Sequence, residues 1–220
     1  MTKGRGGSTI AIDIVMIKSE KYFLLPFMVI WIGALIFLFI EGKIEAHLIL
    51  NSCHTTWLDL FFKYFTEIGG WIPFIVAGIL LLFKWRISVV ILLGQLVATL
   101  ITTPLKRIIR APRPSVVLSD LGIDFPIVEG VDLHSTLSFP SGHTSAAFAF
   151  CLAIALFCPK WWQKLLCLLL AFLGGYSRIY LSQHFLEDVL AGALIGVVSI
   201  LLLIPFVTKI KNYGYKKEKY

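Results

Sequence analysis

The sequence contains few charged residues for its length. Only 15% of its 220 residues are Asp, Glu, Lys or Arg, whereas about 25% is usual in soluble domains. Hydrophobic residues make up 58% of the chain, and the mean hydropathy is +0.85. This balance excludes an ordinary soluble domain and predicts a protein that crosses a membrane several times.

Cysteine is also scarce. The chain has four cysteines, and no two of them form a CxxC pair. Three of the four (Cys151, Cys158 and Cys167) lie in or beside apolar runs, where cysteine serves as a small apolar residue. This pattern excludes a disulfide-rich fold, and the chain shows no clustered metal ligands. We expect no structural disulfide, no metal ion and no cofactor.

Long apolar runs take up most of the sequence and predict the fold. The first run has 19 residues, or about 29 Å of helix against a hydrocarbon core of about 30 Å. We predict an all-α membrane protein with six spans in a single membrane-embedded domain, residues 1–220. The spans are Tyr22–Ile40, Ile68–Phe83, Ile87–Leu105, His143–Phe157, Leu165–Leu181 and Val189–Val207.

The segment between the first two spans, residues 41–70, mixes aromatic and charged residues. Its apolar residues recur at helical spacing (Trp57, Leu58, Phe61, Phe62 and Phe65). We interpret this segment as an amphipathic helix that lies in the headgroup region on the outer side of the membrane.

The distribution of basic residues predicts the orientation. With both termini in the cytoplasm, thirteen of the 20 Lys and Arg residues lie on the inner side, as the positive-inside rule requires. Residues 1–21 and the basic tail 208–220 are then cytoplasmic, and the loop 106–142 is on the outer side. The net charge of +7 indicates anionic lipid as a partner rather than nucleic acid, because no basic stripe lies on a polar helix.

Five of the seven outer basic residues sit at the outer ends of spans three and five or in the adjoining loop. They are Lys106, Arg107, Arg110, Arg113 and Arg178. A cation at membrane depth costs about 2.5–3.5 kcal/mol, so we expect a bound anion between the helix ends to compensate. Three stretches of the chain, residues 106–113, 138–143 and 177–188, lie on the same side of the membrane. This follows from the number of predicted spans that separate them.

The first of these stretches, KRIIRAPRP, holds Arg113 between two prolines that stiffen the loop. A rigidly held guanidinium binds phosphate through a fork of donors, whereas Lys106 supplies a point charge. The alternative is a juxtamembrane basic cluster that only touches lipid headgroups, and this applies above all to Arg107 and Arg110.

The second stretch, PSGH, predicts a helix start that binds an anion. Ser141 is a good N-cap, and Gly142 lets an oxyanion approach the backbone closely. The free N–H groups of the first turn favour an anion, and His143 can give a proton to a leaving oxygen bound there. The alternative is an ordinary capped helix with a histidine at the interface.

The third stretch contains His184 and Asp188, which are four residues apart and would share one face of a helix. A carboxylate on one ring nitrogen frees the other nitrogen as a nucleophile. The alternative is a structural pair at the start of span six. We expect Glu187 to be solvated.

Three other histidines, His47, His54 and His134, lie in outer loops, and we predict them to be solvated or interfacial. The loop 115–137 is either a lid over the site or a loop packed on the bundle. The GxxxG pattern of Gly192 and Gly196 indicates close helix packing inside one bundle rather than dimerisation.

Taken together, K-x6-R-P, P-S-G-H and S-R-x5-H-x3-D resemble the signature of the type 2 phosphatidic acid phosphatase superfamily, in its membrane lipid phosphatase branch. The resemblance implies that His184 is a nucleophile forming a phosphohistidine, that Asp188 orients it, and that His143 is the general acid. It also implies a phosphate site without a metal, made by Lys106, Arg113, Ser141, Gly142 and Arg178.

The predicted function is therefore an integral membrane lipid phosphatase that acts at the outer face, in a bacterial inner membrane. The resemblance suggests undecaprenyl diphosphate, phosphatidylglycerol phosphate, phosphatidic acid and lipid A as substrates, and we favour a monomer. The alternatives are a membrane anion or lipid transporter, a vanadium-dependent haloperoxidase and a catalytically inactive phospholipid-binding relative. Six spans argue against the haloperoxidase, which is soluble.

Overall fold

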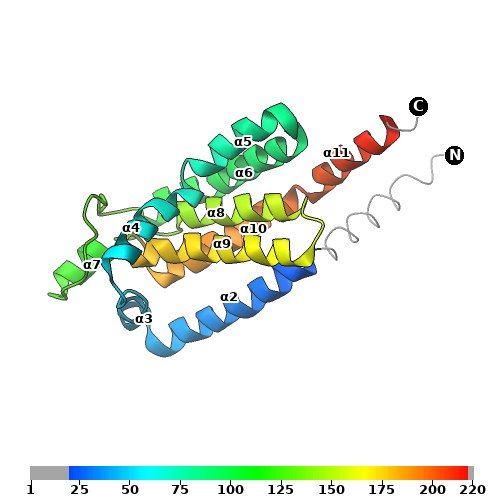
Figure 1. Cartoon of the computed structure of the whole chain (residues 1–220). Coiled ribbons are helices and arrows are strands. Elements are labelled where there is room, and N and C mark those ends of the chain that lie inside the picture. The colour runs from blue at the N-terminus through cyan, green and yellow to red at the C-terminus, as the bar shows by residue number, and fades with distance from the viewer. Residues whose placement is uncertain (1–19, 218–220) are drawn as a thin grey trace.

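The computed structural model describes residues 20–217 and the side chains of residues 20–210. Over this range the protein consists of helices and connecting segments, without a strand. Both ends of the described chain lie at one end of the bundle, and the short helices α3 and α7 lie at the other (Figure 1). The predicted cytoplasmic segment 1–21 and the end of the tail 208–220 lie largely outside the described residues.

The predicted apolar runs form helices whose bounds differ slightly from the prediction. In chain order the elements are α2 (Lys21–Glu41), α3 (Lys43–Leu50), α4 (Thr56–Phe65), η1 (Thr66–Gly69), α5 (Ile72–Phe83), α6 (Trp85–Ile109), α7 (Pro114–Asp120), α8 (Gly142–Ala155), α9 (Trp161–Tyr180), α10 (Leu186–Leu202) and α11 (Ile204–Lys217).

By length and composition, two stretches of the described chain suffice to cross a membrane: α2 and the stretch Trp85–Asp120, which contains α6. The count rises to four if each of two bent pairs is one span. These pairs are Thr56–Gly69 with Ile72–Phe83, bent by 55°, and Leu186–Leu202 with Ile204–Ile210, bent by 44°. The all-helical membrane class is thus confirmed, while the number of six spans stays a prediction.

Two stretches differ from the predicted continuous helices. Residues 41–70 form α3, α4 and η1 instead of one amphipathic helix, because Gly42 has a φ of 78° and residues 52–55 are non-helical. The sixth apolar run is also interrupted, since α10 ends at Leu202 and α11 starts anew. Pro205, in the first turn of α11, has no N–H to continue the hydrogen bonding of α10.

Helix α8 lies at the centre and packs against α6, α9, α10 and η1. Small residues allow this packing. A Cβ added at Gly192 would lie 2.5 Å from the carbonyl oxygen of Ser141, and one at Gly196 would lie 2.4 Å from that of Ser145. The GxxxG pattern therefore packs α10 on α8 within the chain, as predicted, and sets the start of α10 beside the start of α8.

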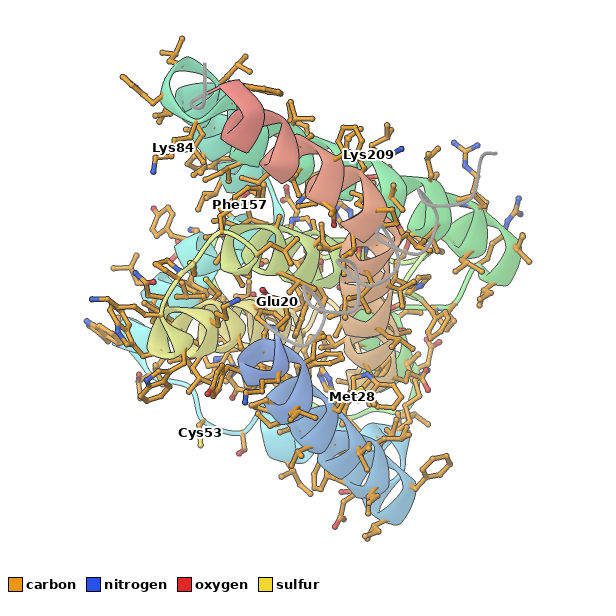
Figure 2. The ribbon with its side chains drawn as sticks, turned by 90° about the vertical axis from the view of Figure 1, so that its right-hand side faces the viewer. Glu20, Met28, Cys53, Lys84, Phe157 and Lys209 are labelled. Atoms are coloured by element: carbon orange, nitrogen blue, oxygen red, sulfur yellow. The ribbon has the colours of Figure 1, made fainter. Side chains whose placement is uncertain are left out.

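The end of the bundle that carries the described chain ends contains a buried ion pair between Glu20 and Lys164 of α9. Figure 2 looks along the bundle from that end and shows Glu20 near the middle of the view, where α2 begins. All four cysteines are free thiols, and Cys151 and Cys167 are buried.

Candidate active site

The residues predicted from the three stretches meet at the end of the bundle that carries α3 and α7. They come from the end of α6 and the loop after it, the start of α8, the end of α9, the loop before α10 and the first turn of α10. His143 interacts electrostatically with both Arg178 and His184, and also with Arg113 and Lys106. Segments up to 82 positions apart in the sequence therefore form one cluster.

His184 and Asp188 form the buried centre of this cluster, with exposed fractions of 1% and 0%. Oδ2 of Asp188 lies 3.4 Å from Nδ1 of His184, which is long for a hydrogen bond. The same oxygen accepts a bond of 2.9 Å from the backbone N–H of Phe185. His184 precedes α10, so the predicted shared helix face is wrong, and the pair forms because Asp188 reaches back over the helix start.

The loop that carries His184 is a tight turn at the end of α9. The backbone N–H groups of Gln183 and His184 both donate to the carbonyl of Arg178, at 2.9 and 3.1 Å. Ser182 closes the turn with a left-handed φ of 50°. This turn places Nδ1 of His184 toward Asp188.

Ser138 completes the centre and was not predicted from the sequence. Its buried Oγ donates to Oδ2 of Asp188 at 2.6 Å and lies 3.3 Å from Nδ1 of His184. Its backbone N–H donates to the carbonyl of Ala111, which ties it to the loop after α6. The only sequence signal is its place two residues before Pro140, a position that no rule of spacing singles out.

The start of α8 has the predicted N-cap. Oγ of Ser141 accepts bonds from the backbone N–H of Thr144 at 3.3 Å and from its hydroxyl at 2.8 Å. The helix begins at Gly142, so the N–H groups of its first turn have no acceptor within the helix. A Cβ added at Gly142 would lie 3.7 Å from Lys106, which places that lysine over the helix start.

The three predicted phosphate-binding cations bind neutral oxygens. Nη1 of Arg113 donates to both the carbonyl and Oε1 of Gln183, at 3.1 and 2.9 Å. Arg178 donates to the hydroxyl of Thr66 at 2.6 Å, and Lys106 to the carbonyl of Leu137 at 2.6 Å. Within the described part of the chain none of these cations pairs with a carboxylate, so their charge is available to an anion.

These charges also set the protonation of the loop histidine. Burial, followed by the positive charges of Arg178, Arg113 and Lys106, holds the pKa of His184 well below its usual value. Burial also lowers the pKa of Arg113, while the charge of Asp188 acts in the opposite direction. The imidazole of His184 is therefore neutral near pH 7 and can act as a nucleophile through Nε2.

Helix η1 contacts the site and was missed by the sequence interpretation. Thr66 binds Arg178, and Gly69 lies against the first turn of α8. A Cβ added at Gly69 would lie only 2.0 Å from the carbonyl oxygen of His143. Glycine is thus required there by the close approach of η1 to the backbone of His143.

Several polar residues outside the motifs differ from the prediction. His47 is fully buried rather than solvated, and Nδ1 of His54 lies 2.9 Å from Oδ1 of Asp59 while its ring stacks on Tyr180. Glu187 pairs with Lys43 at 2.7 Å. His134 is exposed, as predicted.

The loop 115–137 packs on the bundle. Lys63 of α4 donates to the carbonyl of Glu129 at 2.7 Å, and Gln183 donates to that of Asp132 at 2.6 Å. Nε of Arg113 donates to the carbonyl of Thr136 at 3.0 Å, so the loop forms one wall of the site. Arg107 and Arg110 are exposed and make no contact with the cluster, in line with the alternative considered for them.

The family model of the PAP2 superfamily matches residues 83–212, which is more than half of the chain and contains all eight predicted site residues. The chain belongs to the PAP2 superfamily. Several relatives of this chain are named as lipid phosphatases or diphosphatases. The chain is 32% identical over 170 residues to the lipid A 4'-phosphatase of Bacteroides thetaiotaomicron, covering 70% of this chain and 73% of the relative.

Two solved structures have similar folds. LpxE of Aquifex aeolicus is 30% identical with a TM-score of 0.65, over 73% of this chain and 93% of that one. The transmembrane PAP2 type phosphatidylglycerolphosphate phosphatase of Bacillus subtilis is 22% identical with a TM-score of 0.57, over 90% and 98% of the two chains. The second similarity concerns the fold alone.

Proposed function

We propose that this PAP2 protein hydrolyses a phosphomonoester or the terminal phosphate of a lipid diphosphate through a phosphohistidine intermediate. The observation that carries the proposal is the buried His184–Asp188 pair, which lies beside three cations that form no ion pair with a carboxylate among the described residues. Such a site suits a phosphoryl group, whose charge spreads over three oxygens in the transition state.

In the proposed first step, Nε2 of His184 attacks phosphorus and the bond to the leaving oxygen breaks. His143 gives its proton to that oxygen, and Asp188 stabilises the developing imidazolium through Nδ1. Lys106, Arg113 and Arg178, with the Ser141 hydroxyl and the Gly142 N–H, bind the phosphoryl oxygens. In the second step water attacks phosphorus, His143 takes its proton, and inorganic phosphate leaves His184.

The proposed topology has six membrane crossings, with both termini in the cytoplasm of a bacterial cell and the site at the outer face of the inner membrane. It is supported by the charge distribution and by the position of the site at the end of the bundle opposite the described chain ends (Figure 1). In this arrangement α3 and α4 lie at the level of the outer headgroups. A lipid substrate then keeps its tail in the bilayer while its phosphate reaches the helix ends.

The test is a phosphate-release panel with purified protein in detergent. It compares phosphatidic acid, phosphatidylglycerol phosphate, lipid A and undecaprenyl diphosphate, with His184→Ala as the blank. We expect release from at least one of these lipids and none from His184→Ala, which should remain folded. Turnover retained by the His184→Ala protein would refute the role of His184, and no release from any of the four lipids would refute the function.

A further inference from the structure

Helix α3 presents one polar face to the loop that carries the nucleophile. Lys43 and His47 are four residues apart on α3, and Asn51 follows at the same spacing as its C-cap. This spacing places all three on the same side of the helix. Helix α3 lies outside residues 83–212, so the motifs of the superfamily say nothing about it.

The two ends of this face bind the two ends of the loop. Lys43 pairs with Glu187 at 2.7 Å and lies over the ring of Phe185, 4.2 Å from its centroid. Asn51 donates to the carbonyls of Ile179 and Tyr180, at 2.9 and 2.8 Å. The end of α9 and the start of α10 are thus joined by α3 as well as by the loop itself.

His47 occupies the middle of the face. It is 0% exposed, and its ring packs edge-on against Phe185 with centroids 5.2 Å apart. Neither ring nitrogen has a hydrogen-bond partner among the described residues, and Oδ1 of Asp188 is also buried without one. The two side chains interact electrostatically. An unsatisfied buried polar group costs about 1–3 kcal/mol, so two such groups near each other favour a shared partner.

We infer that His47 is a positioning residue for the nucleophile loop, whose ring N–H satisfies Oδ1 of Asp188 through one buried water molecule. A buried water typically links two to four otherwise unsatisfied polar groups. Burial lowers the pKa of His47 to about 4, so its ring is neutral near pH 7 and has one N–H to donate. The inference adds a residue to the proposed site, and its functional meaning rests on the proposed function.

The predicted consequence concerns the basicity of His184. A donor on Oδ1 shares the negative charge of Asp188, so its removal leaves more of that charge to stabilise the imidazolium of His184. The pKa of His184 should therefore rise when His47 loses its donor. A net hydrogen bond of about 0.5–1.5 kcal/mol corresponds to a shift of roughly half to one pH unit.

The experiment uses the full chain with 15N-labelled histidine in detergent, and follows the titration of the His184 ring by NMR. His47→Phe keeps the aromatic contact with Phe185 and removes the donor, whereas His47→Gln keeps a donor. We expect His47→Phe to raise the titration midpoint by roughly half to one pH unit and His47→Gln to shift it less. His134→Phe, the same change at an exposed histidine, should leave the midpoint unchanged.

An unchanged His184 midpoint in folded His47→Phe would overturn the inference, and so would equal shifts in the Phe and Gln variants, which would indicate packing alone. If His47→Phe does not fold, His47→Leu removes the donor with a smaller side chain and decides in the same way. Phosphate release is measured in parallel. If the wild-type protein releases no phosphate while His47→Phe still raises the His184 midpoint, the proposed function is refuted and the inference stands.

Discussion

Replacing Ser138 by alanine tests the arrangement around the proposed nucleophile. The hydroxyl of Ser138 is buried, donates to Oδ2 of Asp188 at 2.6 Å and lies 3.3 Å from Nδ1 of His184. Alanine removes this donor and leaves Oδ2 with the backbone N–H of Phe185 and the imidazole. Because Oδ2 then loses part of its support, we expect His184 to be held less firmly in the geometry needed for attack.

The expected magnitude follows from the charge on the acceptor. A hydrogen bond to a charged group contributes about 1.5–3 kcal/mol, and each 1.36 kcal/mol in the activation barrier changes the rate about tenfold. If the contribution is expressed fully in the transition state, kcat of Ser138→Ala should fall by roughly 10- to 150-fold. KM should change little, because Ser138 contacts the catalytic pair and not the cations that bind phosphate.

The assay measures phosphate release in detergent together with thermal unfolding. Ser115→Ala is the matched control, because the Ser115 hydroxyl only donates to the carbonyl of His134 in the exposed loop, at 3.1 Å. It should leave kcat unchanged. The reasoning is refuted if folded Ser138→Ala has the same kcat as Ser115→Ala.

Three further changes test other parts of the site. Gly69→Ala should lower the unfolding temperature and the activity, since its Cβ would lie 2.0 Å from a backbone oxygen and overpacking costs about 1–3 kcal/mol. Gly78→Ala is the control, because a Cβ there would have no atom within 4 Å. Equal unfolding temperatures of the two variants would contradict the close packing at Gly69. The depressed pKa of His184 places the acid limb of the pH profile of kcat/KM below pH 6.5. Arg113→Gln removes a positive charge near His184, so it should move this limb to higher pH. A limb that stays in place would exclude this electrostatic effect. His143→Ala should slow the hydrolysis of lipids with poor leaving groups far more than that of an aryl phosphate, and equal losses would argue against a general acid.

The residues of the proposed site could be selected from the sequence because the proposed chemistry demands particular residue types. Three local patterns carry these residue types. They are an arginine between two prolines, an N-cap serine followed by glycine and histidine, and a histidine four residues before an aspartate. The number of spans between them then places the three stretches at one end of the bundle. The details of the His184–Asp188 pair were mispredicted, because spacing alone does not reveal that α10 begins only at Leu186.

The supporting residues could not be predicted, because their partners are distant in the sequence. Ser138 binds a residue 50 positions away, Arg113 reaches Gln183 across 70 positions, and Thr66 reaches Arg178 across 112. His47 has the sequence context of an ordinary loop histidine, and only the fold buries it against Phe185. Ser138, Gln183, Thr66 and His47 carry no local pattern that distinguishes them from solvated polar residues.

The sequence by itself determined the membrane class, the helical runs and the residue types of the proposed catalytic cluster, since these follow from local composition and spacing. Only the tertiary structure decided which neutral oxygens hold the cations, which groups surround Asp188, and how closely η1 and α3 approach the site. The physical reason is that hydrogen bonds and close packing depend on distances of a few ångströms between segments that the order of the chain does not bring together.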